Sequence, residues 1–163
     1  MNVTIREINH DDWPVWRSVR LQALTESPAA FGSTLADWTN AADHRWRDRI
    51  RAVNLNLVAF HDNHPIAQVS ANLDEGNSTV ELTSMWVSPT ARGLGVADTL
   101  IDTITTWAND RHADQIVLSV KHTNHHARRL YERHHFIDDG TGDDPDELRM
   151  TRPLPHTTPA PQP

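Results

Sequence analysis

The sequence predicts a mixed α/β fold, of the α+β kind, in which one sheet of about six or seven strands is flanked by about four helices. Three observations predict this class. The first half contains apolar runs separated by short turns, which is typical of an antiparallel meander. The second half alternates strand and helix patterns, which requires a parallel pair of strands joined by a crossover. The length of 163 residues fits a single domain.

The first third of the chain predicts one strand and two helices. Residues 2–8 alternate in hydropathy as a strand does. A helix is expected over 11–25, where apolar residues keep helical spacing and Pro14 falls in the first turn, which tolerates proline. Residues 28–34 follow as a loop. The pattern over 37–53 predicts the second helix, with Trp46 facing inward and several arginines facing outward.

The middle of the chain predicts a meander of three antiparallel strands, 55–61, 66–73 and 79–87, separated by turn sequences rich in Asp, Asn, Gly and Pro. The pattern then changes to alternating strands and helices. The expected order is helix 93–111, strand 115–120, helix 124–133 and two short strands, 136–137 and 148–150, around an acidic loop. The antiparallel part of the sheet is therefore N-terminal and the parallel pair lies in the middle.

The C-terminus differs in composition from the rest of the chain. Five of the 10 prolines stand within residues 153–163. A segment of this composition cannot bury a core, so residues 1–152 are expected to form the domain and residues 153–163 a disordered Pro-rich tail.

Charge and composition exclude several classes of function. The net charge of −7 argues against nucleic acid as a partner, because phosphate contacts need a basic face. The absence of Cys excludes disulfides and thiol nucleophiles. The 11 histidines include no His-Glu-x-x-His pattern, so no metal is expected. No apolar run approaches a membrane span and no leader pattern is recognised, so the expected location is cytoplasmic, with no membrane partner.

The most informative segment is 87–97, where a predicted strand ends, a loop with two glycines follows and a helix begins. Glycines let successive backbone N–H groups turn toward one point, and the helix N-terminus adds free donors and a positive dipole end. Arg92 adds a forked cation. A pyrophosphate is the natural guest of such a loop. A nucleotide-hydrolase loop would need a Lys, and a dinucleotide fingerprint would need Gly where Asp98 stands.

Two segments together resemble a known family. Arg92-Gly93-Leu94-Gly95-Val96-Ala97 resembles the Arg/Gln-x-x-Gly-x-Gly/Ala signature of the GNAT superfamily of acyl-CoA N-acyltransferases, and Trp86–Pro89 resembles the strand end that precedes it. Asn124-x-x-Ala127-x-x-Leu130-Tyr131-Glu132-x-x-x-Phe136 is similar to the family's second signature. Arg20–Phe31 looks like the first-helix segment of one branch, so the resemblance spans about residues 2–152. The family usually has Gly where this chain has His135.

The resemblance implies a site for acetyl-CoA as co-substrate, and it names the residues that hold it. In the family, the strand that matches 79–87 diverges from the strand that matches 115–120, and the pantetheine arm lies in the gap. Backbone groups of Met85, Trp86 and Val87 are then expected to hold this arm and to polarise the thioester carbonyl, while Asn124 contacts it. The residues expected at the pyrophosphate are Arg92, Gly93, Leu94, Gly95, Val96 and Ala97.

The resemblance also implies the chemistry, a direct attack of an amine on the thioester in a ternary complex. Tyr131 resembles the family's general acid for the departing thiolate. An alkyl ammonium, with a pKa of about 10.4, must first lose a proton. Glu81, or a chain of waters, is the expected base, and a solvated strand carboxylate is an equal interpretation of Glu81.

The acceptor side is less defined by sequence. The acidic residues of 138–147 either attract a cationic amine or form a solvated hairpin. Phe31, Trp38 and Trp46 either line an acceptor pocket or belong to the core, and the core is favoured. The expected function is N-acetylation of a small-molecule or peptide amine, with a non-catalytic acyl-CoA-binding module as the alternative. A homodimer is a family tendency only.

Overall fold

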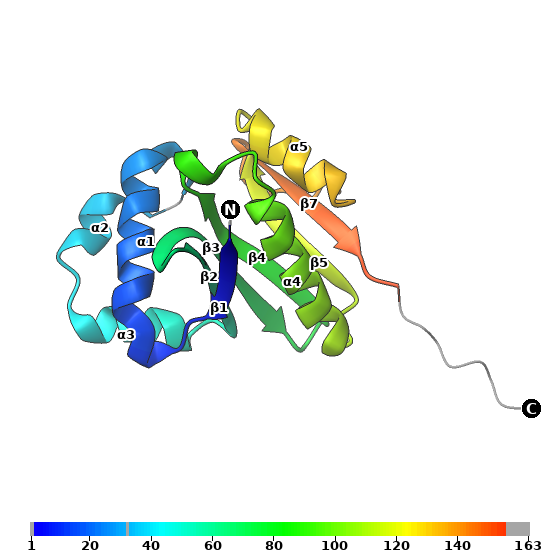
Figure 1. Ribbon diagram of the computed structural model, residues 1–163. Helices are drawn as coiled ribbons and strands as arrows, with labels where there is room; N and C mark the ends of the chain where they lie inside the picture. Colours follow the sequence, from blue (N-terminus) through cyan, green and yellow to red (C-terminus); the bar gives the residue numbers. More distant parts are fainter. Residues whose placement is uncertain (1, 32, 156–163) are drawn as a thin grey trace, which may run out of the picture.

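A computed structural model describes residues 2–31 and 33–155 (Figure 1). It confirms the mixed α/β class, with one seven-stranded sheet in the order β1-β2-β3-β4-β5-β7-β6. The strands are β1 (Val3–Glu7), β2 (Leu55–His61), β3 (His64–Asp74), β4 (Thr79–Val87), β5 (Gln115–Lys121), β6 (Ile137–Asp138) and β7 (Glu147–Pro153). The α-helices are α1 (Trp13–Glu26), α2 (Leu35–Thr39), α3 (Asp43–Arg51), α4 (Val96–Asp110) and α5 (His125–Arg133).

The sheet is antiparallel throughout the described residues except for one pair. β1 to β4 form the predicted meander, and β4 pairs with β5 in parallel through the crossover that contains α4. The last two strands pair antiparallel, with β7 between β5 and β6. β7 is longer than the predicted 148–150, because its pairing follows β5 along the whole of that strand.

The sheet is buried on both faces. Alternate residues of β2 belong to two hydrophobic cores, one on each face of the sheet. Leu57 packs with α4 on one face, and Val58 packs with α1 and α3 on the other. Figure 1 shows α1, α2 and α3 gathered on one side and α4 and α5 on the other. Burial on both faces explains why residues 55–60 are apolar almost without a break, instead of alternating with polar residues.

The predicted helix 37–53 is wrong as a single element, because two helices occupy it. Thr34 and Asp37 form a reciprocal capping box that starts α2 at Leu35, two residues before the predicted position. This helix ends at Thr39, and Asn40, a poor helix former, is its C-cap. Trp38 and Trp46 then pack against each other with ring centroids 4.7 Å apart and ring planes tilted by 46°, which holds α2 against α3.

The sequence predicted that several arginines of α3 face outward, and Arg45 and Arg51 are exposed, whereas Arg49 is not. Arg49 turns toward the sheet, where Asn56 and Ser70 accept hydrogen bonds from its guanidinium. Trp46 and Ile50 are buried as expected. Helical spacing placed Arg49 near the apolar side of the helix, but the partners that attract it come from β2 and β3.

β4 and β5 separate along their length. Their pairing runs from Thr79↔Gln115 to Glu81↔Val117 and then stops, although both strands continue. Beyond this point β4 stays paired with β3, and β5 with β7. Ser84 lies in the left-handed region with φ of 58°, inside a shift of the β3–β4 register, which marks a bulge. The bulge turns the end of β4 away from β5 and opens the middle of the sheet.

The described chain continues past residue 152. β7 includes Pro153, and Leu154 is buried, with its N–H bonded to the Asp114 carbonyl at 2.8 Å. Most of the expected tail, residues 156–163, lies outside the described residues. Among the helices of the described residues, none is long and apolar enough to cross a membrane.

Candidate active site

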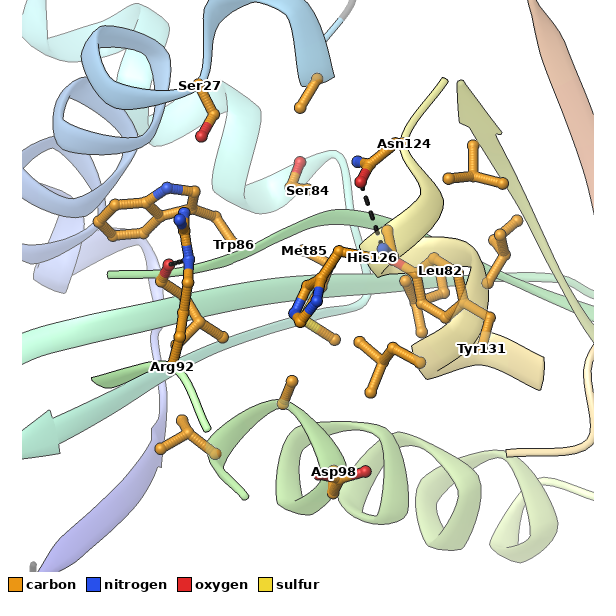
Figure 2. A pocket seen from close by; sticks show the side chains of 18 of the residues that line it. Ser27, Leu82, Ser84, Met85, Trp86, Arg92, Asp98, Asn124, His126 and Tyr131 are labelled. Carbon is orange, nitrogen blue, oxygen red and sulfur yellow. Dashed lines mark hydrogen bonds between the residues drawn. The ribbon is translucent and has the colours of Figure 1, made fainter. Parts of the chain in front are cut away.

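A cavity of about 610 Å³ opens where β4 and β5 separate. Its walls come from β4, β5, the loop before α4, the first turn of α4, and α5, with the segment after α1 closing one side. Figure 2 shows Arg92 and Trp86 at one end of this cavity, Asn124 and Tyr131 at the other, and the His126 ring between them. The cavity therefore joins the two segments that the sequence singled out, 87–97 and 124–136.

The glycine loop is open toward this cavity. Gly93 and Gly95 have φ of 79° and 80°, a conformation that other residues rarely adopt, so α4 begins at Val96 and not at the predicted Gly93. A Cβ built on either glycine meets no atom within 4 Å. No side chain caps α4, so its first N–H groups remain free donors. This combination fits a diphosphate, since free donors and open space lie at the positive end of the helix dipole.

Arg92 does not extend freely over the loop, because two groups hold its guanidinium. Its Nε donates to the Val87 carbonyl at 3.0 Å, and Nη2 donates to Glu26 Oε2 at 2.8 Å. Trp86 Nε1 donates to the same carboxylate oxygen at 2.8 Å. The hydrogen bond from Ser27, followed by those from Trp86 and Arg92, lowers the pKa of Glu26 to about 2. Glu26 thus anchors Arg92 at the rim of the cavity.

The edge of β4 supplies backbone groups to the gap. The N–H of Ser88 donates to Ile66 on β3, and neighbouring residues of a strand direct their polar groups to opposite sides. The Val87 carbonyl accordingly points away from β3, as its bond with Arg92 shows. Met85, two residues earlier, shares this side and also lines the cavity. Backbone groups at the free edge of a strand can bind an extended amide-containing chain.

α5 presents Asn124 and Tyr131 to the cavity. Asn124 caps the helix by accepting the Ala127 N–H at 3.2 Å, which leaves its own NH₂ group available (Figure 2). Tyr131 is 6% exposed and packs edge-on against Phe136. Burial raises the pKa of Tyr131, so its phenol stays protonated at neutral pH. His135 takes the left-handed conformation, with φ of 67°, that Gly would provide at this helix end.

Two residues that the sequence assigned to the site do not line the cavity. Glu81 is exposed and lies at the last paired position of β4, before the strands separate. Leu94 is 54% exposed and its side chain faces solvent. The cavity does include the other predicted residues: Met85, Trp86, Val87, Arg92, Gly93, Gly95, Val96, Ala97, Asn124 and Tyr131.

The structure adds Ser27 and Ser84 to the cavity, which the sequence did not reveal. Phe31, which the sequence left open as a pocket residue while favouring the core, lines it as well. Asp98 also lines it and pairs with His134 at 2.7 Å, which joins α4 to α5. Bulges and contacts between distant segments leave no signal in local hydropathy, so no sequence pattern would have located these residues.

A comparison with known protein families agrees with the geometry of this cavity. A model of the acetyltransferase (GNAT) family matches residues 5–136. The chain belongs to the GNAT family. Its expected membership and fold are therefore confirmed, and the divergent strands, glycine loop and Tyr131 helix are parts of a GNAT domain. No groups of three or more potential metal ligands are found within 2–31 and 33–155.

Solved structures with the same fold cover nearly the whole chain. A GNAT acetyltransferase from Streptococcus pneumoniae has a TM-score of 0.78 at 15% identity, covering 94% of this chain and 100% of its own. PaiA N-acetyltransferase from Thermoplasma acidophilum, in complex with coenzyme A, has 0.77 at 16%, with 94% and 100% covered. Ribosomal-protein-alanine N-acetyltransferase from Brucella melitensis has 0.72 at 24%, with 93% and 99% covered. A search of curated proteins found no match.

Proposed function

We propose that this GNAT protein is an N-acetyltransferase that transfers an acetyl group from acetyl-CoA to a primary amine by direct attack in a ternary complex. The observation that carries the proposal is the position of Tyr131, buried in the wall of the cavity that opens between β4 and β5. A module that only bound coenzyme A would need the glycine loop and the strand edge, but no buried phenol at the gap.

The chain's own groups divide the binding between two regions. The N–H groups around Gly93 and Gly95, with the first turn of α4, bind the diphosphate. The backbone of Met85 and Val87 and the amide of Asn124 hold the pantetheine arm. When bound, acetyl-CoA supplies an acetyl group activated as a thioester. A β4 N–H donates to the carbonyl oxygen of that thioester and stabilises the charge that develops there.

Tyr131 then acts on the leaving group. The amine nitrogen bonds to the acetyl carbon, the carbon–sulfur bond breaks, and the sulfur departs as a thiolate that requires a proton. Tyr131, whose buried phenol is protonated at neutral pH, donates its proton to the sulfur as the carbon–sulfur bond breaks. Before the attack the acceptor ammonium loses one proton to water, since Glu81 lies outside the cavity and is too exposed to be sheltered with the substrate. The second proton, which the nitrogen loses after the carbon–nitrogen bond forms, returns through water to the Tyr131 phenolate.

The acceptor is an amine of a small molecule or of a peptide. The structural neighbour from Brucella, which acetylates a ribosomal-protein alanine by its name, supports a peptide N-terminus as one of these classes. We assign the acceptor to the side of the cavity lined by Ser27, Ala30 and Phe31.

Two measurements on the wild-type protein test the proposal. Calorimetry with coenzyme A should show saturable binding, and thiol release from acetyl-CoA should depend on an added primary amine. Binding without release across a broad panel of amines and short peptides would establish the non-catalytic module instead. Failure to bind coenzyme A on well-folded protein would exclude both.

A further inference from the structure

A cluster of polar side chains lies between the sheet and the helices α1 and α3. At its centre, Arg49 donates to Asn56 Oδ1 at 3.1 Å and to Ser70 Oγ at 3.2 Å. Its guanidinium also lies 3.5 Å from Ser84 Oγ and over the ring of Trp16, at 5.3 Å from the ring centroid. Asn56 and Ser70 are almost completely buried. Neutral groups therefore surround this positive charge.

A second partly buried arginine, Arg20, lies on α1. The guanidinium of Arg20 lies over the ring of Phe31, at 4.6 Å from the ring centroid. Its Nη1 is inaccessible to solvent and has no hydrogen-bond partner. On β3, Gln68 is fully buried and both polar atoms of its amide lack partners. Buried donors without partners are costly, so this part of the protein holds unused capacity to bind a polar group.

The two arginines have no carboxylate to balance them. Neither forms an ion pair with Asp or Glu in the part of the chain that the structure describes. Burial, followed by repulsion from Arg49, lowers the pKa of Arg20 to about 10, which shows that the two charges are close enough to interact. An unbalanced pair of cations is unexpected inside a protein with a net charge of −7. Charges arranged at such cost are typical of binding sites.

Both arginines contact residues of the cavity wall from the side of that wall that faces away from the cavity. Phe31, which Arg20 covers, and Ser84, which Arg49 approaches, both line the cavity. Figure 2 shows Ser27 and Ser84 across the cavity from α4. This wall is therefore on the side of the cavity that we assign to the acceptor. It lies away from the glycine loop, which we assign to the diphosphate.

Resting on the proposed function, we infer that the acceptor is a small amine that also carries a carboxylate, and that Arg20 and Arg49 select it from behind Phe31 and Ser84. Ser84 Oγ donates a hydrogen bond to the carboxylate in front and lies against the Arg49 guanidinium behind. The acceptor amine is then held toward the gap between β4 and β5. The two arginines are specificity-determining residues and take no part in the transfer of the acetyl group.

The geometry sets the size of the expected effect. A carboxylate bonded to Ser84 Oγ would lie ~6 Å from the Arg49 guanidinium. At an effective dielectric constant of ~20, a pair of opposite charges at this separation favours binding by about two powers of ten. We therefore expect kcat/KM for a well-placed carboxylated amine to exceed that of its neutral analogue by ~100-fold.

The test compares amines that differ only in the carboxylate. L-Alanine is paired with L-alaninol, β-alanine with propanolamine, and γ-aminobutyrate with butanolamine, with thiol release from acetyl-CoA as the assay. The expected result is that at least one acid exceeds its alcohol by about tenfold or more. Equal rates in every pair, or a preference for the alcohols, would overturn the inference.

Substitutions of the two arginines test whether these residues cause the preference for a carboxylated amine. Arg49→Met should remove most of the preference for the carboxylated amine and Arg20→Met should lower it, while the rate with the neutral analogue stays within about threefold of wild type. Arg49→Lys keeps the charge and should keep part of the preference, which guards against a Met variant that fails to fold. The matched control is Arg47→Met, on the same helix and stacked over Trp13 at 5.5 Å, which should change nothing. Equal losses for both members of a pair would show a structural role and overturn the assignment.

A binding measurement separates failure of this inference from failure of the proposed function. Propionate and propionamide are titrated against the thermal stability of the wild type and of Arg49→Met at matched ionic strength. Stabilisation of the wild type by propionate alone, lost in Arg49→Met, supports an anion site even if no amine is acetylated. No difference between the two ligands would exclude the anion site, whether or not amine-dependent thiol release is observed.

Discussion

The substitution Gly95→Ala tests the diphosphate site with little ambiguity. Gly95 has φ of 80° and precedes the first residue of α4, and an added Cβ meets no atom within 4 Å. The protein itself therefore does not clash with the new methyl group. The methyl group would instead occupy the space that we assign to the diphosphate, and it would bias the loop away from the conformation that exposes its N–H groups.

The structure supplies a matched control. Gly140, in the acidic loop between β6 and β7, has φ of 72°, and an added Cβ there also meets nothing within 4 Å. It does not line the cavity. Both substitutions place Ala in the left-handed region, which costs about 1–2 kcal/mol. For a domain of this size, that corresponds to a decrease in Tm of about 2–8 °C for each variant.

Of the two substitutions, only Gly95→Ala should weaken the binding of coenzyme A. Charge-assisted hydrogen bonds contribute about 1.5–3 kcal/mol each, so losing two of them lowers affinity by about 100-fold or more. Isothermal calorimetry gives Kd for the wild type and both variants, and thermal melts give Tm. If Gly95→Ala lowered Tm as Gly140→Ala does but bound coenzyme A within about threefold of wild type, the glycine loop would not be the diphosphate site.

Three further predictions concern single carboxyl or phenol groups. Tyr131→Phe should lower kcat by about 10²–10⁴-fold while calorimetry shows an unchanged Kd for coenzyme A; full turnover would remove its role as general acid. Glu26→Gln should be less stable than wild type at neutral pH by urea denaturation. Because the folded pKa of Glu26, about 2, lies below its ordinary value of 4.5, its stabilisation is present above pH 4.5 and is lost as the pH falls toward 2. The difference between the two proteins should therefore shrink across that window, and a constant difference would contradict it. Glu81→Gln should leave kcat/KM within about threefold of wild type from pH 6 to about 9, and a pH-dependent loss would restore Glu81 as the base.

The sequence predicted elements whose signals are local. The apolar run over 55–61, the alternation over 79–87, the helical spacing over 93–111 and the motif around Gly93 and Gly95 each depend on neighbours in the chain. The resemblance of two such segments to one family was sufficient to place both on one cavity. Local signals did not resolve the break between α2 and α3, where a capping box competes with a continuous helical pattern.

Tertiary structure alone decided which side chains meet. Glu26 binds Trp86 and Arg92, 60 and 66 residues away along the chain. Arg49 faces inward because β2 and β3 bring Asn56 and Ser70 beneath it. Sequence periodicity assigns a residue to a face of its own helix or strand, but it carries no information about what packs against that face. For this protein the chain itself specified the class of fold and the glycine loop before α4, whereas the position of Glu81 outside the cavity and of two unbalanced arginines behind it arose only from packing between distant segments.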